Sequence, residues 1–159
     1  MIAAVVLAVV LVAPGGPTVE EAAAFSRAPA TAPAPPADGP LLDLEQDGVA
    51  FPAWTEKFGW EATGTRTGEL DGRAATTVVY EKDGKTLAYT IVGGDALDAP
   101  DDADTITAEG TPVKIFEADG QLAATWEREG QTCVLTGAGV DGAKLAELAG
   151  WTGKGAVAF

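Results

Sequence analysis

The sequence predicts an α+β domain: an antiparallel sheet of five to six strands with a short helix near each end, preceded by an apolar N-terminal helix and a Pro/Ala-rich linker. Two observations support this prediction. Short segments rich in β-branched and aromatic residues alternate with acid–Gly pairs, a pattern typical of hairpins joined by tight turns. In addition, 47% of the residues are apolar, which is enough to build a packed core.

Residues 1–16 are expected to form a partial transmembrane or signal-anchor segment, because residues 2–13 are an unbroken apolar run. A helix needs about 20 apolar residues to span a bilayer, so this run is too short alone. It also lacks the basic flank and the small-residue cleavage site of a signal peptide. Three interpretations stay open: the end of a transmembrane helix that begins upstream, which the abrupt start favours, an unusual signal peptide or signal anchor, and a buried core helix.

Residues 17–40 are predicted to be a linker, because this stretch is rich in Pro and Ala. Its prolines favour extended polyproline geometry, which makes a semi-rigid spacer. A short helix over residues 19–27 is the one regular element expected in it. The folded domain is expected to cover residues 41–153, and residues 154–159 a short tail.

The domain is expected to begin with an apolar strand at residues 41–44 and to carry a short helix within residues 51–60. Pro52 suits the first turn of this helix and Gly59 suits its end. A second helix is predicted to begin at Asp141, a residue type preferred as an N-cap, and to end at Gly150.

Hairpins are predicted between the two helices. On residues 86–92, Leu87, Tyr89 and Ile91 alternate toward the core, so the intervening side chains are expected to point the other way. The strands expected here are residues 74–80, 86–92, 113–117, 122–128 and 132–136, with turns at Asp83-Gly84, Asp119-Gly120 and Glu129-Gly130.

The composition argues against catalysis and against nucleic-acid binding. Ten Lys and Arg against 24 Asp and Glu give a net charge of −14, which repels phosphate backbones. The chain contains no His, one Ser (Ser26) and one Cys (Cys133), so the usual general base, the usual nucleophiles and Cys/His zinc patterns are missing. We therefore expect a protein that is not an enzyme, with no catalytic, cofactor-binding or metal-binding residues and no cofactor.

Two features of the sequence are candidate functional sites, one for a metal ion and one for a reactive thiol. An acidic loop over residues 95–109 is expected to be solvated, with a weak divalent-cation site as the alternative. Its aspartates are Asp95, Asp98, Asp101, Asp102 and Asp104. Cys133 is expected to be an inert buried thiol, with redox sensing or an intermolecular disulfide as the alternatives.

The aromatic residues form a third candidate feature. They are expected to pack in the core, with an apolar cleft for a lipid or peptide between helix and sheet as the alternative. The set comprises Trp54, Trp60, Trp126 and Trp151 with Phe58, Tyr80, Tyr89 and Phe116.

Two segments give the chain a resemblance to a known family. Residues 51–60 have the pattern FPAW-x(3)-FGW, and residues 126–135 have the pattern W-x-R-x-G-x-x-C-x-L. With the apolar run, the spacer and the closing LAELAGW, they resemble the extracytoplasmic part of actinobacterial single-pass anti-sigma factors and related transmembrane regulators. The resemblance covers residues 1–153.

The resemblance implies a single-pass protein of the cell membrane whose main domain is extracytoplasmic and responds to envelope conditions. In that family a cytoplasmic domain, often with a zinc-binding H-x(3)-C-x(2)-C motif, holds a sigma factor. Because this sequence has no His and one Cys, a sigma factor could be held only through a missing cytoplasmic part. Gln131 also departs from the family, in which many relatives have His there.

The sequence therefore predicts a non-enzymatic extracytoplasmic sensor or interaction domain of a membrane-anchored regulator. Its expected partners are the membrane, through the N-terminal segment, and an envelope protein or protease, but no nucleic acid. The alternative is an anchored or secreted binding module for a small apolar ligand or an envelope protein.

Overall fold

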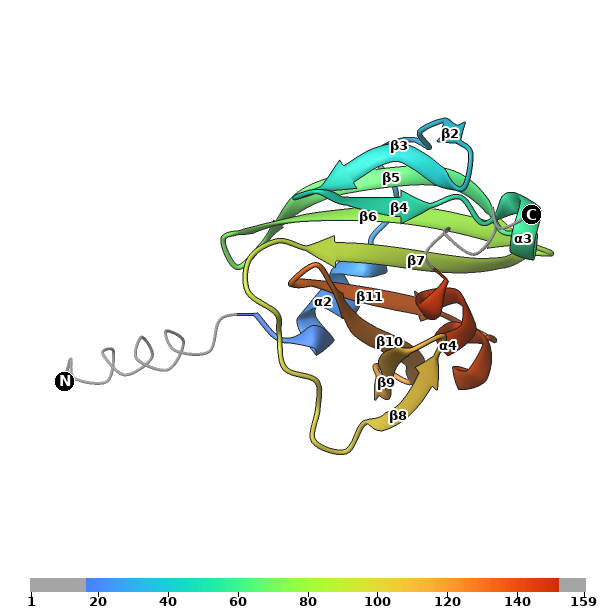
Figure 1. Cartoon of the computed structure of the whole chain (residues 1–159). Coiled ribbons are helices and arrows are strands. Elements are labelled where there is room, and N and C mark those ends of the chain that lie inside the picture. The colour runs from blue at the N-terminus through green and yellow to red at the C-terminus, as the bar shows by residue number, and fades with distance from the viewer. Residues whose placement is uncertain (1–16, 152–159) are drawn as a thin grey trace.

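The computed structural model describes residues 17–151, which form a mostly β fold with short helices (Figure 1). The helices are α2 (Val19–Ser26), α3 (Thr55–Phe58) and α4 (Gly142–Gly150). The first strands are β1 (Ala32–Pro33), β2 (Ala37–Asp38), β3 (Leu41–Gln46), β4 (Val49–Pro52), β5 (Glu61–Leu70) and β6 (Arg73–Lys82). The others are β7 (Lys85–Val92), β8 (Asp104–Ala108), β9 (Thr111–Ala118), β10 (Gln121–Arg128) and β11 (Gln131–Gly137).

Eight strands form one antiparallel sheet in the order β1-β5-β6-β7-β11-β10-β9-β8, and β2-β3-β4 form a second, smaller sheet. The large sheet contains a three-stranded meander, β5-β6-β7, and a four-stranded meander, β8-β9-β10-β11. They join where β7 pairs with β11, with Tyr89 opposite Leu135. Each meander is built from neighbouring segments of the chain, so its pairing is local.

Tight turns of one kind join most of these strands. In six acid–Gly pairs the acidic residue has φ between 47° and 52° and the glycine between 80° and 85°. Two successive residues with positive φ are characteristic of a type I′ turn, whose twist matches that of the flanking strands. The pairs are Asp47-Gly48, Asp71-Gly72, Asp83-Gly84, Glu109-Gly110, Asp119-Gly120 and Glu129-Gly130.

The expected antiparallel sheet of five to six strands is wrong in its count, because the large sheet has eight strands and a second sheet among the described residues has three. The prediction missed the β5–β6 hairpin, whose turn is Asp71-Gly72, since its first strand has Gly and Thr rather than large apolar residues. It also assigned residues 104–108 to an acidic loop, whereas they form edge strand β8, paired with β9. The apolar N-terminal helix expected over residues 2–13 lies outside the described residues.

The predicted short helices are present near the expected positions. Helix α3 is one turn long and ends at Gly59, whose φ is 79°. Pro52 is not in its first turn, because it is the last residue of β4. Helix α4 begins at Asp141, whose side chain accepts a hydrogen bond from the Lys144 backbone. Trp151 follows α4 and is buried against Phe58, with ring centroids 5.8 Å apart.

The large sheet is covered on both faces, which we name by the two faces of β7. The front face, which bears Tyr89, packs against α4, α3 and the small sheet in the larger core cluster. The back face, which bears Thr90, packs against α2 in a second cluster that includes Val92 and Val134. Thr90 is fully buried, so this strand has no solvent-facing side at its centre.

The segment predicted to be a linker, residues 17–40, contains parts of the fold. Val19, Ala22 and Ala23 of α2 are fully buried on the back face, and β1 pairs with β5. The chain then passes the β5 edge of the sheet, and β2 pairs with β3 in the small sheet (Figure 1). Residues 17–40 are therefore not only a linker. The small Ala side chains of α2 allow close packing on the sheet, although the sequence is of low complexity.

Residues 17–151 contain no helix that is long and apolar enough to cross a membrane.

Candidate functional site

A chain of buried hydroxyl groups attaches α2 to the centre of the large sheet. The Oγ atom of Ser26, in the last turn of α2, lies 2.6 Å from Oγ1 of Thr90 on β7. Thr90 Oγ1 in turn lies 2.6 Å from Oγ1 of Thr77 on β6. Ser26 also donates to the carbonyl of Ala22 at 2.9 Å. All three hydroxyl residues are at most 1% exposed, so they form a polar connection inside an apolar contact.

Two arginines hold the C-terminal end of α2. Arg27 donates to the Asp119 carboxylate at 2.9 Å and to the Ala118 carbonyl at 2.6 Å, both near the β9–β10 turn. Arg66 on β5 donates to the Phe25 carbonyl at 3.2 Å and lies 4.2 Å from the centre of the Phe25 ring. These contacts join α2 to strands at opposite sides of the sheet.

The Arg27 attachment is incomplete, because its Nε atom is buried and has no hydrogen-bond partner among the described residues. A buried donor left without an acceptor costs about 1–3 kcal/mol. This cost offsets part of the stabilisation from the other two Arg27 contacts.

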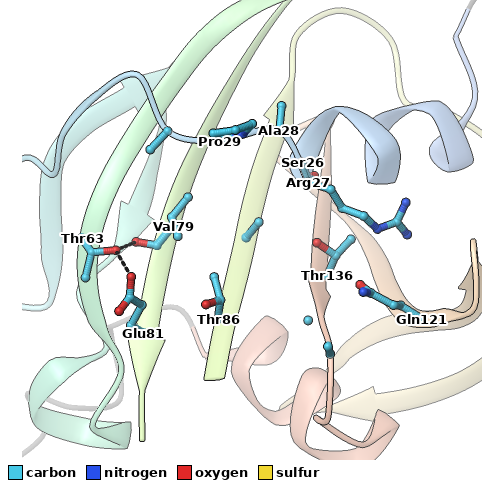
Figure 2. A pocket seen from close by; sticks show the side chains of 14 residues that line it. Ser26, Arg27, Ala28, Pro29, Thr63, Val79, Glu81, Thr86, Gln121 and Thr136 are labelled. Atoms are coloured by element: carbon cyan, nitrogen blue, oxygen red, sulfur yellow. Dashed lines mark hydrogen bonds between the residues drawn. The ribbon is translucent and has the colours of Figure 1, made fainter. Parts of the chain in front are cut away.

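A pocket of about 500 Å³ lies on the back face, beyond the end of α2 (Figure 2). Residues 26–30 form one side of it and the large sheet forms its floor. The floor bears hydroxyl, amide and carboxylate groups together with small side chains. The lining residues from the sheet and the β11–α4 loop are Thr63, Val79, Glu81, Thr86, Ala88, Gln121, Thr136, Gly137 and Ala138. A second pocket, of about 450 Å³, shares Gln121, Gly137 and Ala138 with it.

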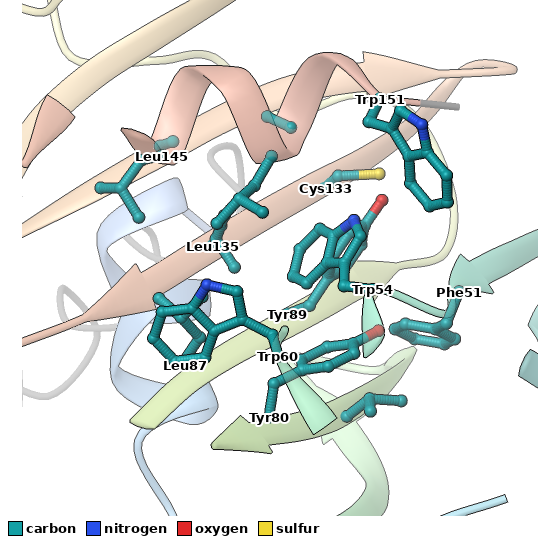
Figure 3. Packing of buried hydrophobic residues seen from close by; sticks show 14 of the residues in the cluster. Phe51, Trp54, Trp60, Tyr80, Leu87, Tyr89, Cys133, Leu135, Leu145 and Trp151 are labelled. Atoms are coloured by element: carbon teal, nitrogen blue, oxygen red, sulfur yellow. The ribbon is translucent and has the colours of Figure 1, made fainter. Parts of the chain in front are cut away.

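The aromatic residues expected in the core pack in the front-face cluster, except Phe116, which belongs to the back-face cluster. Tyr89 is central to them (Figure 3). Its ring centroid lies 5.2 Å from that of Phe51, 5.7 Å from that of Trp54 and 5.2 Å from that of Trp126. The polar pocket lies on the opposite face of the sheet, so these rings do not line it.

Cys133 is fully buried beside Tyr89. Burial raises the pKa of its thiol from 9.0 to about 11, although the Tyr89 hydroxyl and the Arg128 charge act in the opposite direction. Burial likewise raises the pKa of Tyr89 well above 10.0. Because thiolate is the reactive form of cysteine, a thiol with this pKa is inert at neutral pH.

The segment that carries the W-x-R-x-G-x-x-C-x-L pattern forms the β10–β11 hairpin, in which Trp126 is opposite Cys133. Arg128 donates to the Tyr89 hydroxyl at 3.2 Å and to the Ala149 carbonyl, near the end of α4, at 3.1 Å. Arg128 of this pattern therefore connects the front-face core cluster to α4. This contact gives the pattern a structural explanation. Gln131, the position at which the family often has His, lies at the start of β11.

The acidic residues after β7 do not converge on a common point. Within residues 17–151 no group of three or more His, Cys, Asp or Glu side chains is arranged to hold a metal ion. The loop is held instead through its apolar residues and backbone. Leu97 packs in the back-face cluster, and its backbone amide donates to Thr132 Oγ1 at 2.7 Å.

Sequence reasoning did not identify the residues of the α2 attachment or of the pocket. Ser26 belongs to no motif, and the alternation of residues 86–92 predicts that Thr90 points away from the core. One signal was available: Thr77, Thr90 and Thr136 lie on strands in which most of the neighbouring residues are apolar, which is consistent with burial on both faces.

No known protein-family model, curated protein or solved structure matches this chain.

Proposed function

We propose that this chain is a non-enzymatic interaction domain of a membrane-tethered regulator, located outside the cytoplasm and similar in role to the outer domain of single-pass anti-sigma factors. The apolar residues 2–13 are part of the tether, and the β domain that follows receives the signal. Three features of the sequence and structure support this proposal.

The main support is the docking of α2. Four residues, 14–17, separate the apolar run from Thr18, the N-cap of α2. Thr18 and Glu21 form a reciprocal capping box, so α2 begins sharply at this point. Because α2 is packed on the centre of the sheet, the folded domain begins within a few residues of the apolar run.

The modest apolar contact of α2 also supports a signalling role. A helix that transmits a signal must leave its docked position at a modest free-energy cost. The small buried side chains Ala22 and Ala23 contribute little apolar area to the docking.

The chemistry of the described residues supports a non-enzymatic role. The two groups that are nucleophiles in many enzymes are both engaged in packing: Ser26 is hydrogen-bonded to Thr90 and Ala22, and the Cys133 thiol stays protonated because burial raises its pKa. Neither has a free base beside it, since the chain contains no His.

The experiment is protease treatment of intact spheroplasts that express the full chain, followed by membrane fractionation. We expect the chain in the membrane fraction and the β domain accessible to protease from outside. The matched control is Leu7→Asp/Val10→Asp, since each central charge costs about 2.5–3.5 kcal/mol in a membrane helix. This control should move the chain out of the membrane fraction. A wild-type chain in the soluble fraction, or a β domain protected in intact spheroplasts, would overturn the proposal.

A second candidate function is a binding module that is anchored or secreted. The back-face pocket favours it, because about 500 Å³ is within the range of small-ligand sites, roughly 300–1,000 Å³. The lining mixes polar and apolar groups, with Thr86 and Gln121 beside Val79 and Ala88.

A further inference from the structure

Strand β8 is the last strand at one edge of the large sheet, and no other strand of the described residues lies beyond it (Figure 1). A sheet edge exposes unpaired backbone groups, which proteins often protect with proline, with a bulge or by keeping the strand very short. The other edge strands, β1, β2 and β4, are two to four residues long, and β1 and β4 each contain a proline. Strand β8 has five residues, no proline and a continuous register with β9. It is therefore the least protected edge among the described strands.

The register of β8 with β9 determines which backbone groups of β8 are unpaired. In a two-residue hairpin, the residues that flank the turn form a hydrogen-bonded pair, and such pairs alternate with non-hydrogen-bonded ones. The flanking residues here are Ala108 and Thr111, so Thr105 and Thr107 occupy the non-hydrogen-bonded positions. Pro112, which has no amide hydrogen, is opposite Thr107, as this alternation requires. The backbone amides and carbonyls of the two exposed threonines therefore point to the open edge.

The surroundings of this edge are acidic. Residues 95–109 contain six Asp and Glu and no Lys or Arg. Asp102 is exposed just before β8, and Asp104 and Glu109 are exposed at its two ends. Lys114, on the neighbouring strand β9, adds a positive charge beside the middle of β8. These charges disfavour a second copy of this chain, whose net charge is −14, and favour a strand with basic ends and an uncharged centre.

We propose that β8 binds an extended segment of a partner protein, which adds to the large sheet as one more strand. The segment has Lys or Arg at both ends and uncharged β-branched residues at its centre. Its central side chain packs beside Ile106, which is half-buried at the margin of the front-face cluster. The side chains on either side of it lie beside Thr105 and Thr107, an arrangement that favours threonine. This inference rests on the proposed interaction role and gives that role a surface and a partner.

The test titrates the full chain, in a neutral detergent, against the fluorescein-labelled peptide Arg-Lys-Thr-Val-Thr-Lys-Arg and follows fluorescence anisotropy. The peptide reads the same in both directions, so the test does not depend on strand direction. One comparator is the same peptide with both threonines N-methylated, which keeps the charge and removes two backbone donors. The other is Glu-Asp-Thr-Val-Thr-Asp-Glu, which reverses the charge. We expect saturable binding of the basic peptide and binding of each comparator that is weaker by about tenfold or more.

Amide hydrogen exchange shows where the peptide binds. The amides of Thr105 and Thr107 should exchange rapidly in the free chain and slowly in the complex, because the added strand supplies their acceptors. The amide of Ile106 faces β9 in both states, so its exchange should change little. A peptide held by charge alone would leave all three amides unchanged.

The decisive variant is Thr107→Pro, which removes one amide from the open edge and none from the pairing with β9. Proline is tolerated at an edge position whose amide faces solvent, so the fold should persist. This variant should bind the basic peptide about tenfold more weakly. The matched control is Thr107→Val, which keeps the amide and should bind as wild type. The urea midpoint verifies that both variants are folded.

A charge variant tests the acidic surroundings independently of the backbone. Asp102→Asn/Asp104→Asn should weaken binding of the basic peptide by about threefold to tenfold at low salt, and by less at high salt. The matched control, Asp38→Asn/Asp43→Asn, removes two exposed charges from the small sheet and should have little effect.

Three results would overturn the proposal. The first is no saturable binding of the basic peptide. The second is equally tight binding of either comparator, or unchanged exchange at Thr105 and Thr107 when the basic peptide is bound. The third is a dimer in which these two amides already exchange slowly without peptide, which would assign the edge to a second copy. None of these results depends on membrane fractionation, so this proposal and the membrane location can fail separately.

Discussion

The Oγ atom of Ser26 lies 2.6 Å from Oγ1 of Thr90, and this contact joins the last turn of α2 to the centre of the large sheet. Thr90 is the middle member of the hydroxyl chain, because its Oγ1 also contacts Thr77. A helix at the start of a Pro/Ala-rich stretch is thus held by a polar contact across 64 residues of sequence. The stability of the α2 docking should depend on which member of the chain is removed.

Thr90→Val should destabilise the protein more than Ser26→Ala. The valine leaves two buried hydroxyls without their shared partner, so we expect a loss of about 2 kcal/mol in the free energy of unfolding. Ser26→Ala leaves the Thr77–Thr90 pair intact and should cost about 1 kcal/mol. Urea unfolding measures both, with Thr107→Ala on exposed β8 as the control. Equal losses in the two variants would show that the hydroxyl chain does not act as described.

Glu129→Asn should stabilise the β10–β11 hairpin. Glu129 has φ of 49°, a left-handed conformation that Asn adopts more readily than Glu. We expect a gain of about 0.5–1 kcal/mol in the free energy of unfolding, measured by thermal or urea unfolding. Asp83→Asn is the matched control at an equivalent turn. It should change stability less, since Asp already tolerates this conformation. A destabilised Glu129→Asn protein would contradict the turn assignment.

Gly64→Ala should loosen the segment between α2 and the small sheet. A methyl group at Gly64 would lie 2.6 Å from the Ala30 side chain, much closer than van der Waals contact. We expect a cost of about 1–3 kcal/mol, as for other overpacked sites. Amide exchange should accelerate at Thr31, whose backbone amide donates to Thr65, more than in β7. Thr67→Ala, exposed on the same strand, should leave exchange at Thr31 unchanged.

The protein should lose stability in alkaline solution. The Cys133 pKa is about 11 in the folded state and 9.0 for an ordinary thiol, so the folded state retains a proton that the unfolded state releases. This contribution is complete below pH 9 and is lost as the pH rises toward 11. The resulting loss in the free energy of unfolding amounts to about 2 kcal/mol at pH 11. The urea midpoint measured from neutral pH upward checks the loss, and Cys133→Val should show a smaller one. Rapid alkylation of the native thiol at neutral pH would contradict its burial.

The turns, the front face of β7 and the start of α4 could be predicted from the sequence because their signals are local. The acid–Gly pairs at residues 83–84, 119–120 and 129–130 predicted turns correctly, since positive φ at two successive residues strongly restricts residue type. The alternation of Leu87 and Tyr89 predicted the front face of β7. Asp141 predicted the start of α4 for the same local reason.

The back face was not predictable in the same way. Thr90 has the polarity of a solvent-facing residue, and only its contact with Ser26, far away in sequence, shows why it is buried. The alanines of α2 give a weak amphipathic signal within a Pro/Ala-rich segment. The pocket was missed for a related reason, because its groups come from several strands and the α2 end meets them only in the folded chain.

The packing of the N-terminal helix on strands that come later in the sequence constrains the order of folding. Helix α2 is the first described element that a ribosome would synthesise, yet it packs on Val134 of β11. That residue lies in the last strand of the second meander, and the hairpins of both meanders can pair as soon as they are made. The element made first can therefore complete its docking only after β11 has formed. During this interval the apolar residues of the back face are uncovered.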